Sequence, residues 1–526
     1  MRFALGVKRF TRHTPHAYRS TYQFMDKKVR VRFAPSPTGG LHLGGVRTAL
    51  FNYLFARKNN GTFILRVEDT DQNRFVEGAE EYIVNCLNWC GITPDESPAN
   101  PGNYGPYRQS ERKPSYRKFA EQLISDGYAY YAFDTPEELD AKRKDIPNFQ
   151  YGQATRMDMR NSLTLTISEV EDLLAAKTPH VIRIKVPENE IVHFNDLIRG
   201  DVSFETSLVD DKVLLKADGM PTYHLAVVVD DKAMEITHAF RGEEWLPSAP
   251  THILLWKYLG WESDMPAWAH LPLILKPDGH GKLSKRDGDR LGFPVYAMNW
   301  TDPKTGDTTN GFKEMGFLPE AFVNMLALLG WNDGTDQELF SLKELEEKFA
   351  VDRISKAGAK FDFEKSKWYN HEWIKTQSAE LLSPGVRAEL QKAGIEVSDD
   401  KFLNTIIDLI KDRCNLLPDF VAQSGYFFTN PKEYDVASVK PKWTPEKAEF
   451  FNTFSETLSL NDAVSAEESF KALAAEKGFK PGELMLPFRI MLVGGKFGPG
   501  VFDIAILLGV EETKNRISKA IEVFNH

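Results

Sequence analysis

A glycine-rich turn between a strand pattern and a helix pattern constrains this chain more than any other feature. The turn is PSPTGGLHLGG, residues 35–45; VRVRFAPS leads into it, and VRTALFNYLFARKN and then TFILRVED follow it. A strand, a crossover helix and a second strand in this order predict a βαβ unit with parallel strands. Ligands of such sheets bind at the carboxyl ends of the strands, where this turn lies.

A second set of apolar patterns comes much later in the chain. We expect TYHLAVVVDD and EITHAFRGEEW to be buried strands and THILLWKYLGW to be an amphipathic helix. The fold class is therefore α/β, a Rossmann-like parallel sheet with halves at residues 27–108 and 226–290. The insertion between them, residues 109–225, mixes helix patterns (SYRKFAEQLISDG) with strand patterns (HVIRIKVP, DVSFET), as an α+β subdomain would.

Helical patterns dominate after about Gly292, for example PEAFVNMLALLGW and NTIIDLIKDRCNLLPDFV. We expect an all-helical C-terminal region, divided into residues 291–375 and 376–526. With 526 residues the chain is long enough for several hydrophobic cores, which agrees with a multidomain protein.

Charge and composition exclude some classes of protein. A formal net charge of −10 argues against a protein that coats nucleic acid indiscriminately, although a selective RNA enzyme needs only local basic stripes. No apolar run reaches the length that spans a bilayer, so we expect no membrane partner. The few cysteines fit a reducing compartment, and we expect Cys86 and Cys90 to be buried, unreactive thiols.

The first segment of the chain allows two interpretations. Residues 1–24 contain Arg and Lys but no Asp or Glu, which is the composition of an organelle transit peptide. Met25 also opens MDKKVRVRFAPSP, a natural start, so residues 1–26 can instead be upstream sequence from a misplaced start codon. We favour the second interpretation and a cytoplasmic location; the alternative is a mitochondrion or plastid.

The turn at residues 35–45 has properties that suit a triphosphate. Gly39, Gly40, Gly44 and Gly45 allow the backbone to approach phosphates closely. The start of the following helix is expected to offer free N–H groups and a positive dipole, and His42 adds a donor.

A basic segment, KLSKR, lies in the polar run KPDGHGKLSKRDGDR after the second half of the sheet. We expect Lys282 and Lys285 to be cations on a mobile loop. Such a loop can close on a pyrophosphate leaving group and stabilise the charge that develops there. By itself the segment would be interpreted as a solvated basic loop.

Together the two motifs resemble the HIGH-like and KMSKS-like signatures of class I aminoacyl-tRNA synthetases, in the same order and on the same elements. LRVEDTD, GPYRQSER, DGMPTYHLAVVVDD and RGEEWLPSAPTHILL resemble the bacterial and organellar glutamyl-tRNA synthetases in particular, over about Lys27 to Trp331. In the C-terminal third the resemblance is looser and rests mainly on helical pattern. Gly45 stands where the second histidine of HIGH would be, as is usual in glutamyl enzymes.

The resemblance implies a glutamate site at Arg32, Ser36, Glu68, Tyr223 and Arg241. The chemistry agrees, because two guanidiniums suit two carboxylates and one carboxylate suits the ammonium group. A neutral amide would leave one guanidinium unpaired, which separates this site from that of a glutamine enzyme. Which arginine binds the side-chain carboxylate stays open.

The resemblance also implies an ATP site in which His42, Lys282 and Lys285 are catalytic. Its expected members are Pro35, Ser36, Pro37, Thr38, Gly39, Gly40, Leu41, His42, Leu43, Gly44, Gly45, Glu244, Trp245, Leu275, Lys282, Leu283, Ser284, Lys285 and Arg286.

The implied activity is that of a glutamate–tRNA ligase: glutamate and ATP with Mg²⁺ give glutamyl-adenylate and pyrophosphate, and the glutamyl group then passes to the terminal adenosine of tRNA(Glu). The resemblance assigns residues 109–225 to the acceptor end, 291–375 to the stem and 376–526 to the anticodon, where Arg413 resembles an anticodon-reading arginine. It implies a monomer. We expect no zinc, because AYYAFDTPEELDAKR has no cysteine.

Three other kinds of protein share part of this sequence pattern. A catalytically inactive, RNA-binding paralogue would not need His42, Lys282, Lys285 and Glu68 together. A nucleotidyltransferase that makes a small adenylylated metabolite would not need so long a C-terminal region. The same region argues against the truncated glutamyl-queuosine relative.

Overall fold

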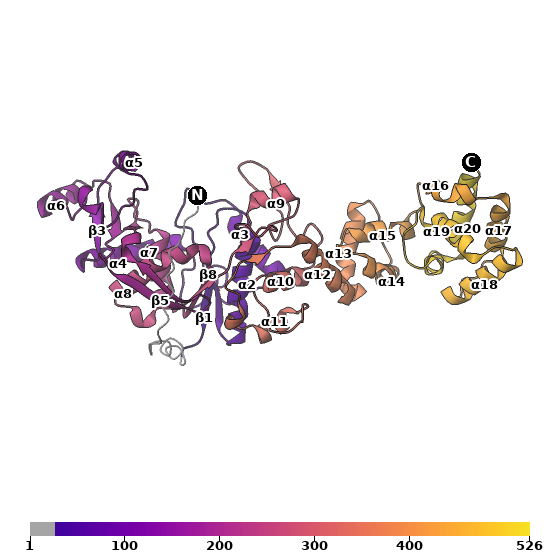
Figure 1. Cartoon of the computed structure of the whole chain (residues 1–526), viewed down its shortest axis with the longest axis horizontal. Helices are drawn as coiled ribbons and strands as arrows, with labels where there is room; N and C mark the ends of the chain where they lie inside the picture. The colour runs from indigo at the N-terminus through magenta and orange to yellow at the C-terminus, as the bar shows by residue number, and fades with distance from the viewer. Residues whose placement is uncertain (1–26) are drawn as a thin grey trace. The chain divides into compact units, whose positions relative to one another are not determined.

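The computed structural model describes residues 27–526, and Figure 1 labels many of its elements. The described chain forms two compact units. One comprises the residues up to Phe312 together with Phe322–Phe363, and the other comprises Lys313–Ala321 with Glu364–His526. The predicted N-terminal extension, residues 1–26, lies outside the described residues.

The predicted βαβ unit is confirmed. Strand β1 (Arg30–Phe33) and strand β2 (Thr62–Leu65) pair in parallel, and helix α2 (Leu43–Lys58) connects them. Both strands are buried along their whole length, as expected of a sheet covered on both faces.

A second parallel pair lies beside the first. Strands β8 (His238–Gly242) and β9 (Ala267–Leu271) are joined by helix α8 (Ala249–Tyr258). Thr237 N donates to Arg30 O at 2.9 Å, which brings β8 beside β1. The chain therefore runs from β1 to β2 on one side and from β8 to β9 on the other. The gap between β1 and β8 is the switch point at which α/β sheets bind ligands.

The strand prediction for TYHLAVVVDD is wrong, because this segment is helix α7 (Tyr223–Ala233). Its residues 225–231 are all buried, so the helix has no polar face and shows no helical period in the sequence. Three consecutive valines favour a strand by propensity, but packing against neighbouring elements overrides that preference. The prediction of a strand in EITHAFRGEEW is confirmed by β8.

Residues 109–225 contribute strands to two different sheets. Strands β3 (Ala129–Ala132), β4 (Val181–Ile184) and β7 (Val213–Leu215) form an antiparallel sheet of their own. The hairpin of β5 (Ile191–Asp196) and β6 (Gly200–Glu205) instead joins β9 in the main sheet. Residues from this interval therefore reach the sheet that carries the switch point.

Further helices and short strands complete this unit. They are α3 (Ala79–Trp89), α4 (Lys113–Ser125), α5 (Pro136–Asp145), α6 (Ile167–Ala175), β10 (Ile274–Leu275), α9 (Lys285–Leu291), β11 (Trp300–Thr301), β12 (Thr308–Thr309), α11 (Leu342–Lys348) and β13 (Ala359–Lys360). Cys86 in α3 and Cys90 at its end are buried, as predicted.

The C-terminal unit is helical, which confirms the prediction for residues 376–526. The prediction of an all-helical segment at residues 291–375 is wrong, because the short strands β11, β12 and β13 lie there. Strands of two residues are too short to leave an alternating pattern in the sequence.

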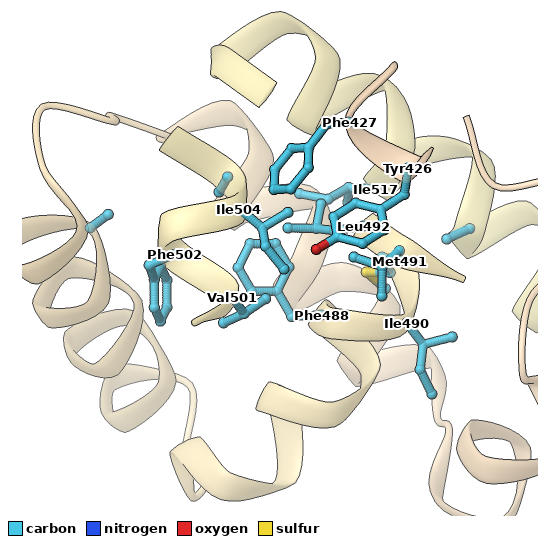
Figure 2. Close-up of a cluster of buried hydrophobic side chains, with 14 of the residues drawn as sticks. Tyr426, Phe427, Phe488, Ile490, Met491, Leu492, Val501, Phe502, Ile504 and Ile517 are labelled. Carbon is cyan, nitrogen blue, oxygen red and sulfur yellow. The ribbon is translucent and has the colours of Figure 1, made fainter. Parts of the chain in front are cut away.

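The helices of the C-terminal unit are α10 (Pro319–Leu328, shared with the first unit), α12 (Phe363–Thr376), α13 (Ala379–Lys392), α14 (Asp400–Ile410), α15 (Asp419–Phe428), α16 (Val436–Val439), α17 (Pro445–Glu456), α18 (Ala463–Glu476), α19 (Pro481–Val493) and α20 (Val501–Asn525). Figure 2 shows Phe488 of α19 and Ile504 of α20 in its buried core. Between residues 27 and 526, no helix is both long and apolar enough to cross a bilayer.

Candidate active site

A cavity of about 1050 Å³ opens beside the carboxyl ends of β1 and β8. Most of the residues predicted for the site line it: Arg32, Pro35, Ser36, Pro37, Thr38, Leu41, His42, Gly44, Gly45, Glu68, Tyr223, Arg241, Glu244, Trp245, Lys282, Leu283 and Ser284. Six do not: Gly39, Gly40, Leu43, Leu275, Lys285 and Arg286. Segments far apart in sequence thus contribute to one chamber.

The start of α2 does not offer the free N–H groups that the sequence predicted. His42 is the N-cap, and its Nδ1 accepts from Gly44 N at 3.1 Å. Leu43 N donates to Val295 O at 2.8 Å, and Gly45 N donates to His42 O at 2.7 Å. The prediction was wrong because the N-cap side chain and a distant carbonyl satisfy these donors. The helix dipole remains.

The hydrogen bond from Gly44 also fixes the protonation of His42. Because Nδ1 accepts a hydrogen bond, it carries no proton, and the single N–H proton of the neutral ring is on Nε2. Burial, together with the nearby Lys282 cation, lowers the pKa of His42 to about 4, so the ring is neutral near pH 7. Nε2 is buried and has no hydrogen-bond partner within residues 27–526. His42 therefore brings an unused N–H donor to the cavity.

The four glycines of the turn are required for different structural reasons. A Cβ on Gly40 would lie 2.8 Å from Cγ of Trp300, so this glycine allows the turn to pack on an indole ring. Gly39 has φ +142°, which an L side chain rarely adopts. Only Gly44 and Gly45 line the cavity.

The KLSKR segment has a defined conformation in the structure. Lys276 N donates to Gly281 O at 3.1 Å and Leu283 N donates to Ile274 O at 2.8 Å, so the segment closes a hairpin with β10. Helix α9 then begins at Lys285. Lys285 Nζ lies 5.8 Å from the ring centre of Tyr296 and does not line the cavity.

Lys282 is the cation of this segment that reaches the cavity. Its Nζ lies 2.7 Å from Oε1 of Glu244, at the beginning of the 3₁₀ turn Glu243–Ser248 after β8. Both side chains are substantially exposed, so this ion pair is easily exchanged for one with a ligand.

The two arginines predicted for glutamate binding differ in their surroundings. Arg32 donates from Nε and Nη2 to the two oxygens of Asp231, at 3.0 and 3.2 Å. Asp231 also accepts from Arg66 Nη1 at 2.7 Å. Burial disfavours ionisation of Asp231, but Arg32 and Arg66 outweigh it and hold its pKa below the usual range. Arg32 is thus already engaged by an internal carboxylate.

Arg241 has a different set of partners. Its Nε donates to Nε2 of His270 at 2.9 Å, and its Nη1 lies 3.1 Å from the hydroxyl of Tyr223 and 2.9 Å from Nδ1 of His252. Nη2 is buried without a hydrogen-bond partner in the described chain. Arg241 is therefore the guanidinium with an unfilled position for an anion.

Glu68 follows β2 and lines the same cavity. One of its oxygens, Oε1, accepts from Arg66 Nη2 at 3.2 Å. Burial raises the pKa of Glu68, although Arg66 and Arg32 oppose that shift. A bound cation would favour the carboxylate form further.

Sequence reasoning missed the residues behind the cavity wall. Asp231 and Arg66 hold Arg32 and Glu68, His252 and His270 contact Arg241, and Asp196 lies behind His270. The sequence feature that could have revealed them is a polar residue inside an apolar run, such as the Asp pair that ends HLAVVVDD.

Across residues 27–526 no three His, Cys, Asp or Glu side chains are grouped so that they could hold a metal ion.

Two family models match this chain. Residues 28–368 match the catalytic domain of class I tRNA synthetases for E and Q, and residues 377–521 match an anticodon binding domain. The first match alone covers more than half of the chain, and it includes every residue named above at the cavity.

Similar proteins agree with these matches. A glutamate–tRNA ligase of Phocaeicola vulgatus is 54% identical over 502 residues, which are 95% of this chain and 99% of that protein. One from Porphyromonas gingivalis is 52% identical over 503 residues, with the same coverage. A crystal structure of a glutamate tRNA ligase from Elizabethkingia meningosepticum in complex with its amino acid has a TM-score of 0.91 and 49% identity, covering 95% of this chain and 100% of that one.

Proposed function

Because this chain belongs to the class I glutamyl-tRNA synthetases, we propose a role for each part of its cavity in the glutamate–tRNA ligase reaction. The enzyme activates glutamate with ATP and transfers the glutamyl group to tRNA. The single observation that carries the assignment of the amino-acid site is the buried, unpartnered Nη2 of Arg241 beside the hydroxyl of Tyr223.

Arg241 binds the side-chain carboxylate of glutamate. The α-carboxylate has to remain available for attack on ATP, so the buried guanidinium with an unpartnered Nη2 suits the carboxylate that does not react. Tyr223 already accepts a hydrogen bond from Arg241 and can donate its own proton to the same substrate group. Arg32, held by Asp231, forms the adjoining wall and contributes positive potential.

Glu68 and Ser36 position the backbone end of the amino acid. The carboxylate of Glu68 pairs with the ammonium group, and burial makes such a pair stronger than it would be in water. Ser36 lines the same cavity and supplies a hydroxyl. The α-carboxylate is thereby directed toward the turn at residues 35–45.

ATP lies along that turn and against Lys282, with its adenosine near Glu244, Trp245 and the backbone at Leu275. An oxygen of the α-carboxylate attacks the α-phosphorus, and the bond from that phosphorus to the β-phosphate bridging oxygen breaks. Pyrophosphate takes that electron pair. His42 donates from Nε2 and Lys282 supplies a positive charge, so both stabilise the phosphates in the transition state.

The other predicted members of the ATP site support these two residues. Lys285 directly follows Ser284, which lines the cavity, and a small displacement of the start of α9 would bring its ammonium group to the leaving phosphates. Each carboxylate at the cavity already has a partner: Glu68 with Arg66, Asp69 with Ser110, Asp71 with Arg74 and Glu244 with Lys282. Mg²⁺ therefore enters with the phosphates of ATP.

The remaining parts of the chain bind tRNA(Glu). Residues 109–225 contact the acceptor end, 291–375 the stem and 376–526 the anticodon, in agreement with the anticodon-domain match. Arg413 is exposed at the end of the 3₁₀ turn Lys411–Arg413, where it can reach a base. We assign the active form to a monomer.

ATP–pyrophosphate exchange tests this function. Exchange is expected with glutamate and not with glutamine, and it is expected to require added tRNA(Glu). Exchange supported by glutamine in place of glutamate would overturn the assignment of Arg241. Charging of separate glutamate and glutamine tRNAs by the same preparation then measures tRNA selection.

A further inference from the structure

Arg241 is held entirely by neutral groups. It contacts His270, His252 and Tyr223 through hydrogen bonds, and its guanidinium carbon lies 4.7 Å from the ring centre of Trp268. Within residues 27–526 no carboxylate forms an ion pair with it. Because an isolated buried charge is unfavourable, an interior guanidinium usually has a carboxylate partner, as Arg32 has here.

The hydrogen bonds fix which nitrogen of each histidine carries the proton. His270 Nδ1 lies 2.6 Å from Oδ2 of Asp196, so Nδ1 carries the proton and Nε2 is left to accept from Arg241. His252 accepts from Arg241 at Nδ1, and its Nε2 donates to Nδ1 of His224 at 3.2 Å. Burial lowers the pKa of His252 and of His270, which keeps both rings uncharged.

We propose that His252 and His270 are positioning residues that fix the Arg241 guanidinium through uncharged acceptors and so reserve its charge for the side-chain carboxylate of the amino acid. A carboxylate at either position would hold the guanidinium equally well but would neutralise it. The enzyme would then lose much of its preference for an anionic side chain over a neutral amide. This inference rests on the proposed role of Arg241.

Asp196 has a part in this arrangement although it lies away from the cavity wall. Its Oδ1 accepts from the backbone N–H groups of Ile198 and Arg199, at 3.0 and 2.9 Å. Its Oδ2 accepts from Nδ1 of His270 at 2.6 Å and from the backbone N–H of the same residue at 3.1 Å. An asparagine here would keep its oxygen on the N–H groups of Ile198 and Arg199 and turn its amide N–H₂ toward Nδ1 of His270. The histidine would then accept at Nδ1 and present N–H to Arg241, where an acceptor is needed.

Two matched substitutions at His252 distinguish the effect of the acceptor's charge on glutamate binding from the effect of its shape. His252→Asn places a neutral oxygen near the position of Nδ1, and His252→Asp places a charged one there. In tRNA-supported pyrophosphate exchange we expect KM for glutamate to stay within about threefold for Asn and to rise at least tenfold for Asp, with kcat less affected. The ratio of glutamate to glutamine use should fall only for Asp. Equal KM values for the two variants would overturn the inference.

A second set of variants covers the case in which His252→Asp does not fold, as judged by thermal unfolding. Asp196→Asn should raise KM for glutamate about tenfold while kcat changes little. The double variant adds His270→Gln to Asp196→Asn. The amide oxygen of the glutamine can accept from Arg241 with either Asp or Asn at position 196, so KM for glutamate should return toward the original value. A double variant no better than Asp196→Asn would contradict the proposed positioning role.

Arg241→Gln distinguishes failure of the inference from failure of the proposed function. An unchanged KM for glutamate in Arg241→Gln would mean that this residue does not bind the substrate, and both ideas would fail. A large rise in KM for Arg241→Gln, with no difference between His252→Asn and His252→Asp, would leave the proposed function standing and reject the inference alone.

Discussion

Lys282 and Glu244, which both line the cavity, form an ion pair with 2.7 Å between Nζ and Oε1 that joins the KLSKR hairpin to the turn after β8. In the proposed function, the phosphates of ATP draw the same ammonium group away from Glu244. On that proposal the ion pair holds the cation near the position of the phosphates before ATP binds.

Replacing Lys282 should affect the chemical step more than amino-acid binding. Lys282→Ala removes a positive charge from the developing pyrophosphate, and kcat for pyrophosphate exchange should fall by about 100-fold, while KM for glutamate changes little. Lys282→Arg keeps the charge and serves as the control. An equal loss in both variants would show that the charge is not what matters.

The two ring nitrogens of His42 should have different roles, with Nδ1 capping the helix and Nε2 acting in the reaction. Asparagine is a good N-cap, so His42→Asn can still accept from Gly44 N, but it has no donor in the place of Nε2. We expect kcat to fall by about 100-fold with a melting temperature close to that of the original protein. His42→Ala, which loses the cap as well, should show the same kinetic loss and a lower melting temperature. Full activity of His42→Asn would reject the donor role.

Lys285 should act only during the reaction, because it lies outside the cavity wall in this structure. Lys285→Gln is expected to lower kcat by about tenfold or more while KM for ATP stays within about threefold, the pattern of an interaction made in the transition state. Steady-state pyrophosphate exchange at varied ATP measures both. If charging were unchanged, the KLSKR segment would owe its role to Lys282 alone.

Acid should destabilise the first unit through three partly buried histidines. Burial lowers the pKa of His42, His224 and His238 to about 4 in the folded protein, against about 6.5 in an unfolded chain. The unfolded chain therefore binds protons first, so this stabilisation is present above pH 6.5 and is lost as the pH falls toward 4.

His238 offers a test of that pH dependence, since burial alone lowers its pKa. Urea unfolding, followed by tryptophan fluorescence at pH 7.5 and at pH 5.5, should show a smaller drop in unfolding free energy for His238→Gln than for the original protein. An identical drop would mean that His238 does not contribute.

The sequence supports the βαβ unit, the helical region at residues 376–526 and most of the cavity residues, because these depend on local pattern and motif. The helix α7 could not be recognised, since its buried residues show no helical period. The expectation of free N–H groups at the start of α2 rested on local sequence alone. It failed partly because the carbonyl of Val295, which is distant in sequence, accepts from one of these groups. The unequal roles of Arg32 and Arg241 likewise depend on Asp231, His252 and His270, whose proximity only the fold creates.

The β5–β6 hairpin gives the interval 109–225 a mechanical connection to the amino-acid pocket. Asp196 ends β5, and through His270 it fixes the acceptor that faces Arg241. A shift of the hairpin relative to β9 would move Asp196 away from His270. Nε2 of His270 could then lose its role as the acceptor for Arg241, although no residue of the cavity wall had moved. If Arg241 selects the amino acid as we propose, the fidelity of that choice depends partly on the segment that we assign to the acceptor end of the tRNA.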